Sequence, residues 1–116
     1  MTIEKTEKDH FIYITYARQG SKDIEQFRTM LSGIQSEKRS EKDIIIDFGA
    51  RKYLASPEIG SIVRLAQGLV GSSRILRIIP CEGLYEQLSS LYLTNLDNLT
   101  IYKNRDDFTD QLKKMR

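Results

Sequence analysis

Apolar and polar positions along the chain follow two periodicities, one typical of strands and the other typical of helices. Runs rich in β-branched and aromatic residues predict four strands, at positions 11–16, 43–48, 74–79 and 99–103. After each strand, apolar residues recur three or four positions apart, as on one face of a helix. These helical stripes comprise Ile24, Phe27, Leu31 and Ile34; Ile59, Ile62, Val63, Ala66 and Leu69; Leu84, Leu88 and Leu91; and Phe108, Leu112 and Met115. Residues 2–6 are expected to add a fifth strand if they pair at a sheet edge.

This alternation favours an α/β fold with a mostly parallel sheet of four or five strands and four covering helices. Three consecutive isoleucines at positions 44–46 suit a central strand that is buried on both faces. The chain shows no internal repeat, low-complexity segment or linker, so residues 1–116 are expected to form a single domain. The predicted core comprises Ile45, Phe48, Ile59, Ile62, Val63, Leu76, Ile78, Leu88 and Ile101.

The composition, with 40% hydrophobic residues, fits a domain that buries its own core. Eighteen basic and sixteen acidic residues leave a net charge of +2 with interspersed signs, which argues against a nucleic-acid-binding face. No apolar run approaches a membrane span, and the N-terminus lacks the apolar segment of a secretion signal. The single cysteine, Cys81, excludes an internal disulfide and a cysteine-rich zinc site. We therefore expect a cytoplasmic protein that has no metal or cofactor and binds no membrane.

Catalytic motifs have little support in the sequence. The letters DFG at 47–49 and SPE at 56–58 are similar to kinase signatures, but 116 residues are too few for a kinase, and no Gly-rich loop precedes them. Asp47 could be the phosphoacceptor of a receiver domain, but that site needs paired acids after the first strand, where the sequence reads YARQGS. No phosphate-binding Gly-rich motif is present, and the single histidine, His10, lies in a polar N-terminal segment. The chain is therefore predicted to be a binding or switching module, not an enzyme.

Ser56 is the best candidate for a regulatory site. It is expected to be the N-cap of the second helix, with its hydroxyl accepting a first-turn N–H and Pro57 at the first helical position. A phosphate on this hydroxyl would meet free backbone N–H groups and the positive end of the helix dipole. The folded domain could then carry the phosphate, while its charge would disrupt a partner docked on that helix. The alternative is that Ser56 is a helix cap and nothing more.

The stretch IIIDFGARKYLASPEIG, residues 44–60, contains an apolar strand that ends in an acid, then a short loop, then Ser-x-x-apolar-Gly at a helix start. The residues that carry this pattern are Asp47, Leu54, Ser56, Ile59 and Gly60. The pattern resembles the STAS domain of the bacterial anti-sigma factor antagonist family, where the serine is the phosphorylation site. The resemblance spans nearly the whole chain, because the family shares the strand and helix alternation and ends in a strand and a short helix. It implies a single STAS domain over residues 1–116.

By this resemblance, the domain takes part in partner switching, in signal transduction and transcription regulation. The unphosphorylated form would bind a GHKL-type serine kinase or a similar anti-sigma factor and so release that regulator's other target. Phosphorylation of Ser56 would end the complex, and a PP2C-type phosphatase would restore it. The expected partner surface joins the start of the second helix to the loop after the first strand. It comprises Gln19, Gly20, Ser21, Lys22, Ala55, Ser56, Pro57, Glu58, Gly60, Ser61 and Arg64.

Two other classes of function stay open from the sequence. The domain could be a non-catalytic accessory subunit of a transporter or a signalling assembly, which the same family fold also serves. A stable complex that is insensitive to the chemistry of Ser56 would favour that role. A small enzyme on an α/β scaffold would need a converging polar pocket, and the sequence offers no histidine or cysteine in position to build one.

Overall fold

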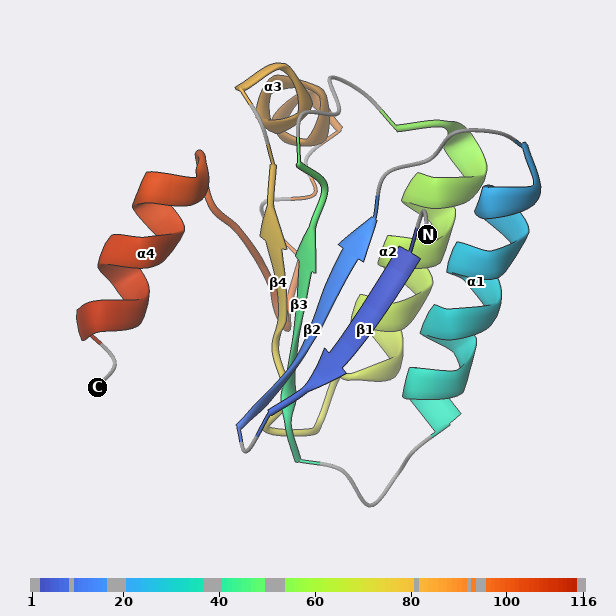
Figure 1. Cartoon of the computed structure of the whole chain (residues 1–116), viewed down its shortest axis with the longest axis horizontal. Coiled ribbons are helices and arrows are strands. Elements are labelled where there is room, and N and C mark those ends of the chain that lie inside the picture. The colour runs from blue at the N-terminus through green and yellow to red at the C-terminus, as the bar shows by residue number, and fades with distance from the viewer. Residues whose placement is uncertain are drawn as a thin grey trace.

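The computed structural model (Figure 1) describes residues 3–8, 10–16, 21–36, 41–49, 54–80, 82–91, 93 and 96–114. In these residues two strands come first, and from the second strand onward each strand is followed by a helix, giving five strands and four helices. The strands are β1 (Ile3–Glu7), β2 (Phe11–Tyr16), β3 (Asp43–Asp47), β4 (Leu76–Ile79) and β5 (Leu99–Ile101). The helices are α1 (Ser21–Ser36), α2 (Ser56–Gly68), α3 (Glu82–Ser90) and α4 (Arg105–Lys114). Every helix and strand that the sequence predicts is thereby present, and the prediction of an α/β fold is confirmed.

The strands form one sheet in the order β1-β2-β3-β4-β5. Strand β1 pairs antiparallel with β2, whereas the other three pairings are parallel. The expected fifth strand is therefore real and lies at the edge, shifted by one residue from the prediction. The register aligns Ile14 of β2 with Ile46 of β3, and Ile46 with Ile78 of β4. This alignment brings the most apolar positions of three strands side by side in the middle of the sheet.

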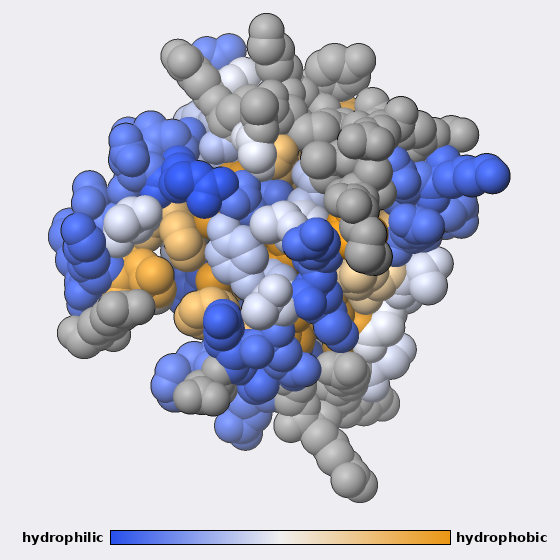
Figure 2. Space-filling model, viewed as in Figure 1, coloured by the Kyte–Doolittle hydropathy of each residue, from blue (hydrophilic) through white to orange (hydrophobic). Residues whose placement is uncertain are grey.

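The two faces of the sheet bury different side chains, because successive residues of a strand point to opposite faces. Ile44 and Ile46 belong to the larger apolar core, together with residues of α1 and α2 such as Phe27 and Leu65. Ile45 belongs to a smaller cluster with Ile79, Tyr102 and Phe108, the last of which lies on α4. Figure 1 accordingly shows α1 and α2 together on one side of the sheet and α4 on the other. Figure 2 shows apolar side chains on the side of α4 that is nearer the sheet, and hydrophilic ones on its outer side.

The predicted core residues all lie in or against these two clusters. Ile45, Phe48, Ile62, Leu76, Ile78 and Leu88 are at most 1% exposed, and Ile59, Val63 and Ile101 are partly buried against the larger core. Leu91 is an exception among the residues of the helical stripes, because 46% of it is exposed. Helix α3 ends at Ser90, so the turn that would bring Leu91 back to the core does not form. Met115 lies outside the described residues.

Candidate functional site

The first turn of α2 carries Ser56, the predicted switch residue. Ala55 precedes the helix with an extended backbone (φ −77°, ψ 159°), and its carbonyl accepts the first helical bond from the Ile59 N–H at 3.0 Å. Ala55 is therefore the N-cap, Ser56 is the first helical residue, and Pro57 is the second. The prediction that Ser56 is the N-cap is wrong by one residue. Ser56 is exposed, as a kinase substrate must be.

The helix is capped by Glu58 instead of by the serine. One carboxyl oxygen of Glu58 accepts the backbone N–H of Ala55 at 2.8 Å, and the other accepts the hydroxyl of Tyr16 at 2.5 Å. An acid at the third helical position commonly reaches back in this way to the N-cap residue. Glu58 is fully buried, so its expected place on an exposed partner surface is wrong. The spacing of Ala55 and Glu58 was the signal in the sequence that could have identified this cap.

An aromatic cluster packs around Tyr16 and holds its ring in place beside Glu58. The ring of Tyr16 stacks on that of Phe27, with ring centroids 4.3 Å apart, and both rings contact Phe48 edge-on or tilted. These residues come from β2, α1 and the end of β3, so the first turn of α2 is tied to three other elements. The backbone beside Ser56 is therefore held by buried contacts, while Ser56 itself faces outward.

The backbone N–H groups of this turn are nearly all in use. The Ala55 N–H donates to Glu58, Pro57 has no N–H, and the Glu58 N–H donates to the Ala55 carbonyl at 3.0 Å. Among the N–H groups of this turn, only that of Ser56 has no hydrogen-bond partner in the described part of the chain. The expectation that a phosphate on Ser56 would meet several free N–H groups is therefore wrong, because the Glu58 carboxyl group already occupies the helix N-terminus. Such a phosphate would instead lie on the exposed surface and change its charge.

The segment that enters α2 is also fixed from α3. The side-chain amide of Gln87 accepts the N–H of Leu54 at 2.7 Å and donates to the Leu54 carbonyl at 3.0 Å. Leu54 itself is 3% exposed and belongs to the larger core. Two hydrogen bonds and a buried side chain thus hold the residue just before the N-cap, which limits how far Ser56 can move.

Other residues of the predicted partner surface are only partly brought together. Pro57, Gly60 and Arg64 are exposed on α2 with Ser56, and Ser56, Gly60 and Arg64 share one helix face because they are four residues apart. We call Ser56, Pro57, Gly60 and Arg64 the Ser56 stripe. Ser61 is buried, with its hydroxyl donating to the Pro57 carbonyl at 2.8 Å, and Ala55 is half-buried. Ser21 and Lys22 begin α1, whereas Gln19 and Gly20 lie outside the described residues.

A second polar cluster surrounds Asp47 at the end of β3, on the face covered by α4. Its carboxylate accepts the Tyr13 hydroxyl at 2.7 Å, the Gly49 N–H at 2.9 Å and the guanidinium of Arg105. Burial acts to raise the pKa of Asp47, but the bonds from Tyr13, Gly49 and Arg105 outweigh it and lower this pKa below 3.8. Burial and the bond to Asp47 also raise the pKa of Tyr13 above 10.0. The cluster explains Asp47 as a structural acid that ties α4 to the sheet.

Asp47 is expected to make the protein more sensitive to acid. Because its pKa is lower in the folded state, its contribution to stability is complete well above pH 3.8 and is lost as the pH falls below this value. Urea unfolding between about pH 6 and pH 3 should therefore show a free energy of unfolding that falls more steeply for the wild type than for Asp47→Asn. Parallel pH dependences for the two proteins would contradict the lowered pKa.

Replacement of Ser56 by alanine is expected to leave stability nearly unchanged. The hydroxyl is exposed and is not the helix cap, so the free energy of unfolding should change by at most about 0.5 kcal/mol. Urea unfolding of the wild type and Ser56→Ala provides the measurement. A loss near 1 kcal/mol, which is typical of a removed N-cap, would mean that the hydroxyl caps α2 after all.

Within the described residues, no three potential metal ligands among His, Cys, Asp and Glu lie close enough together to hold a metal ion. None of the helices described has both the length and the apolar character of a membrane span. Comparison of the chain with models of known protein families and with curated proteins finds no match.

Proposed function

We propose that this protein is a phosphorylation switch that binds a regulatory partner through the Ser56 stripe. One observation carries the proposal: Ser56 is exposed on a helical turn whose opposite side is fixed by buried contacts. A kinase can reach such a hydroxyl without unfolding the domain. Because Glu58 and Gln87 hold the backbone of Ala55 and Leu54, just before Ser56, the backbone of the stripe should keep its conformation after modification, while its surface charge changes.

The effect of a phosphate follows from the charges of the surface. Phosphorylation adds a charge of about −1.5 to −2 at Ser56, and no first-turn N–H other than that of Ser56 is left to neutralise it. The only charged side chain of the stripe, Arg64, lies two helical turns further along α2. A partner that packs on the uncharged start of α2 would have to bury this new charge, at a cost of several kcal/mol unless it offers a cation. Phosphorylation therefore acts on binding and not on folding.

The pathway follows from the resemblance to STAS domains, with which the five-stranded, mostly parallel sheet and four helices are compatible. In this proposal, residues 1–116 are a single cytoplasmic STAS domain without catalytic activity of its own. Its partner is an anti-sigma factor or a GHKL-type serine kinase, which binds the unphosphorylated form and phosphorylates Ser56. A PP2C-type phosphatase regenerates the binding form. The domain requires no cofactor or nucleic acid for this role.

Affinity capture from the source cell, combined with phosphopeptide mapping, tests this function. The chain isolated from cells should carry phosphate on Ser56, and a Ser56→Ala chain should capture a protein that a Ser56→Asp chain does not retain. Ser73→Asp is a matched control, because Ser73 is also exposed but follows the other end of α2. Retention of the same protein by the Ala and Asp chains, or phosphate at other serines only, would contradict the proposal.

A further inference from the structure

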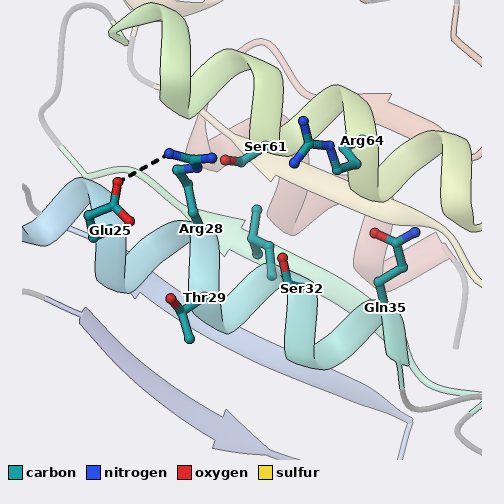
Figure 3. A pocket seen from close by; sticks show the side chains of 8 residues that line it. Glu25, Arg28, Thr29, Ser32, Gln35, Ser61 and Arg64 are labelled. Carbon is teal, nitrogen blue, oxygen red and sulfur yellow. Dashed lines mark hydrogen bonds and ion pairs between the residues drawn. The ribbon is translucent and has the colours of Figure 1, made fainter.

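A polar cleft lies between α1 and α2, on the side of the sheet opposite α4 (Figure 3). Its volume is about 250 Å³, and the buried side chain of Leu31 forms part of its wall. Pockets for drug-sized ligands usually measure about 300–1,000 Å³. The cleft therefore fits a small group and not a nucleotide or a large cofactor. It does not include Ser56.

Two arginines from different helices meet at this cleft. Figure 3 shows the guanidinium groups of Arg28, on α1, and Arg64, on α2, on either side of Ser61. Arg28 forms an ion pair with Glu25 at 3.1 Å, and 44% of its side chain is exposed. Arg64 is exposed and has no acidic partner within the described part of the chain. Since one carboxylate faces two guanidinium groups, the cleft keeps an excess of positive charge.

Neutral hydrogen-bonding groups complete the lining on the α1 side. The hydroxyl of Ser32 and the amide of Gln35 both line the cleft, and Figure 3 shows them on the α1 side, across from Ser61 and Arg64. The Gln35 amide lies against Gly68 of α2, where an added Cβ atom would come within 2.4 Å of Gln35 Nε2. Because Gly68 has no side chain, the Gln35 amide has room to lie against α2 at the end of the cleft. Such donors can bond oxygen atoms that the two arginines attract.

We propose that the α1–α2 cleft binds a dianionic phosphate group, carried by a monoester or present as free phosphate. Guanidinium groups form short, charge-assisted bonds to phosphate and can bind two of its oxygens at once. Three terminal oxygens allow one phosphate to contact both Arg28 and Arg64 and still accept bonds from Ser32 or Gln35. The cleft has room for the phosphate and a short organic group. The cleft does not contain Ser56, but it shares Arg64 with the Ser56 stripe.

Titration of the full-length, isotope-labelled protein by NMR tests this site at about pH 8, where phosphate is mainly dianionic. The probes are inorganic phosphate, O-phosphoserine and glutarate, a dicarboxylate of the same charge, each at ionic strength held constant with sodium chloride. Saturable shifts at Arg28, Ser32, Gln35 and Arg64 are expected with the two phosphates and not with glutarate. Tighter binding of O-phosphoserine than of inorganic phosphate would assign the site to a phosphorylated side chain, and the reverse order to free phosphate. Shifts that grow without saturation, or equal affinity for glutarate, would overturn the proposal.

Variants that remove one positive charge distinguish specific phosphate binding in the cleft from non-specific attraction of anions to the protein. Arg28→Ala and Arg64→Ala should each weaken phosphate binding about tenfold, as the loss of one charged hydrogen-bonding group predicts. Lys113→Ala is the matched control, because it removes an exposed cation from α4 on the opposite side of the sheet. Its affinity should equal that of the wild type. Unchanged affinity in both arginine variants, or an equal loss in Lys113→Ala, would contradict the site. Arg28 is not part of the Ser56 stripe, so its result does not depend on the proposed switch.

Discussion

Replacement of Ile45 by aspartate is expected to unfold the protein. Ile45 is 1% exposed in the central strand β3, where it packs with Ile79, Tyr102 and Phe108. An unpaired carboxylate in these apolar surroundings costs several kcal/mol, in addition to the lost packing, and domains of this size are commonly stable by only about 5–15 kcal/mol. Far-UV circular dichroism and urea unfolding should show a chain without a cooperative transition at 25 °C, a temperature at which the wild type unfolds cooperatively.

The matched control is Ile45→Val, which removes one methylene group from the same position. It should keep the fold and lower the free energy of unfolding by about 1 kcal/mol. A cooperative transition of Ile45→Asp with a midpoint near that of the wild type would contradict the burial of the Ile45 side chain between the sheet and α4. It would mean that α4 leaves this face of the sheet open to water.

Replacement of Glu58 by alanine is expected to produce the second largest loss of stability. The change removes the acceptor of two donors, the buried hydroxyl of Tyr16 and the N–H of the half-buried Ala55. Each buried group without a partner costs about 1–3 kcal/mol, so a total loss of about 3 kcal/mol is expected. Urea unfolding followed by tyrosine fluorescence measures this difference.

Two milder variants separate the hydrogen bonds from packing. Glu58→Gln keeps the length of the side chain and one carbonyl oxygen, so it should lose less than Glu58→Ala. Tyr16→Phe keeps the stack on Phe27 and removes only one donor, so its loss should be about 1 kcal/mol. If Glu58→Ala were as stable as the wild type, the carboxyl group would not cap α2, and the fixed backbone beside Ser56 would lose its explanation.

The elements of the fold were predictable because each has a strong local period. The isoleucines of β3 and the stripe of Phe27, Leu31 and Ile34 on α1 follow patterns that are typical of a buried strand and of a half-buried helix. The ends of helices and strands were less predictable, since they depend on single contacts. Helix α3 stops at Ser90, which leaves Leu91 in solvent although the stripe in the sequence includes it.

The details of the site depended on contacts that the local sequence does not contain. Two local rules compete at Ala55-Ser56-Pro57-Glu58: a serine cap followed by proline, or an acid three residues after the cap. The bond to Tyr16, 42 residues away in sequence, favours the second arrangement and buries Glu58. Acids in a first helical turn are usually exposed, so sequence reasoning placed this one on the surface. The ion pair of Asp47 with Arg105, 58 residues apart in sequence, could not be predicted from the local sequence either.

The central claim is that the charge at Ser56 controls partner binding. Its most direct test is the dissociation constant of the captured partner, measured by calorimetry for the wild type, Ser56→Ala, Ser56→Asp and the control Ser73→Asp. The account predicts nearly equal affinities for the wild type, Ser56→Ala and Ser73→Asp, and binding at least about tenfold weaker for Ser56→Asp. Equal affinities for all four proteins would contradict it, and would instead favour an accessory subunit whose binding does not depend on Ser56.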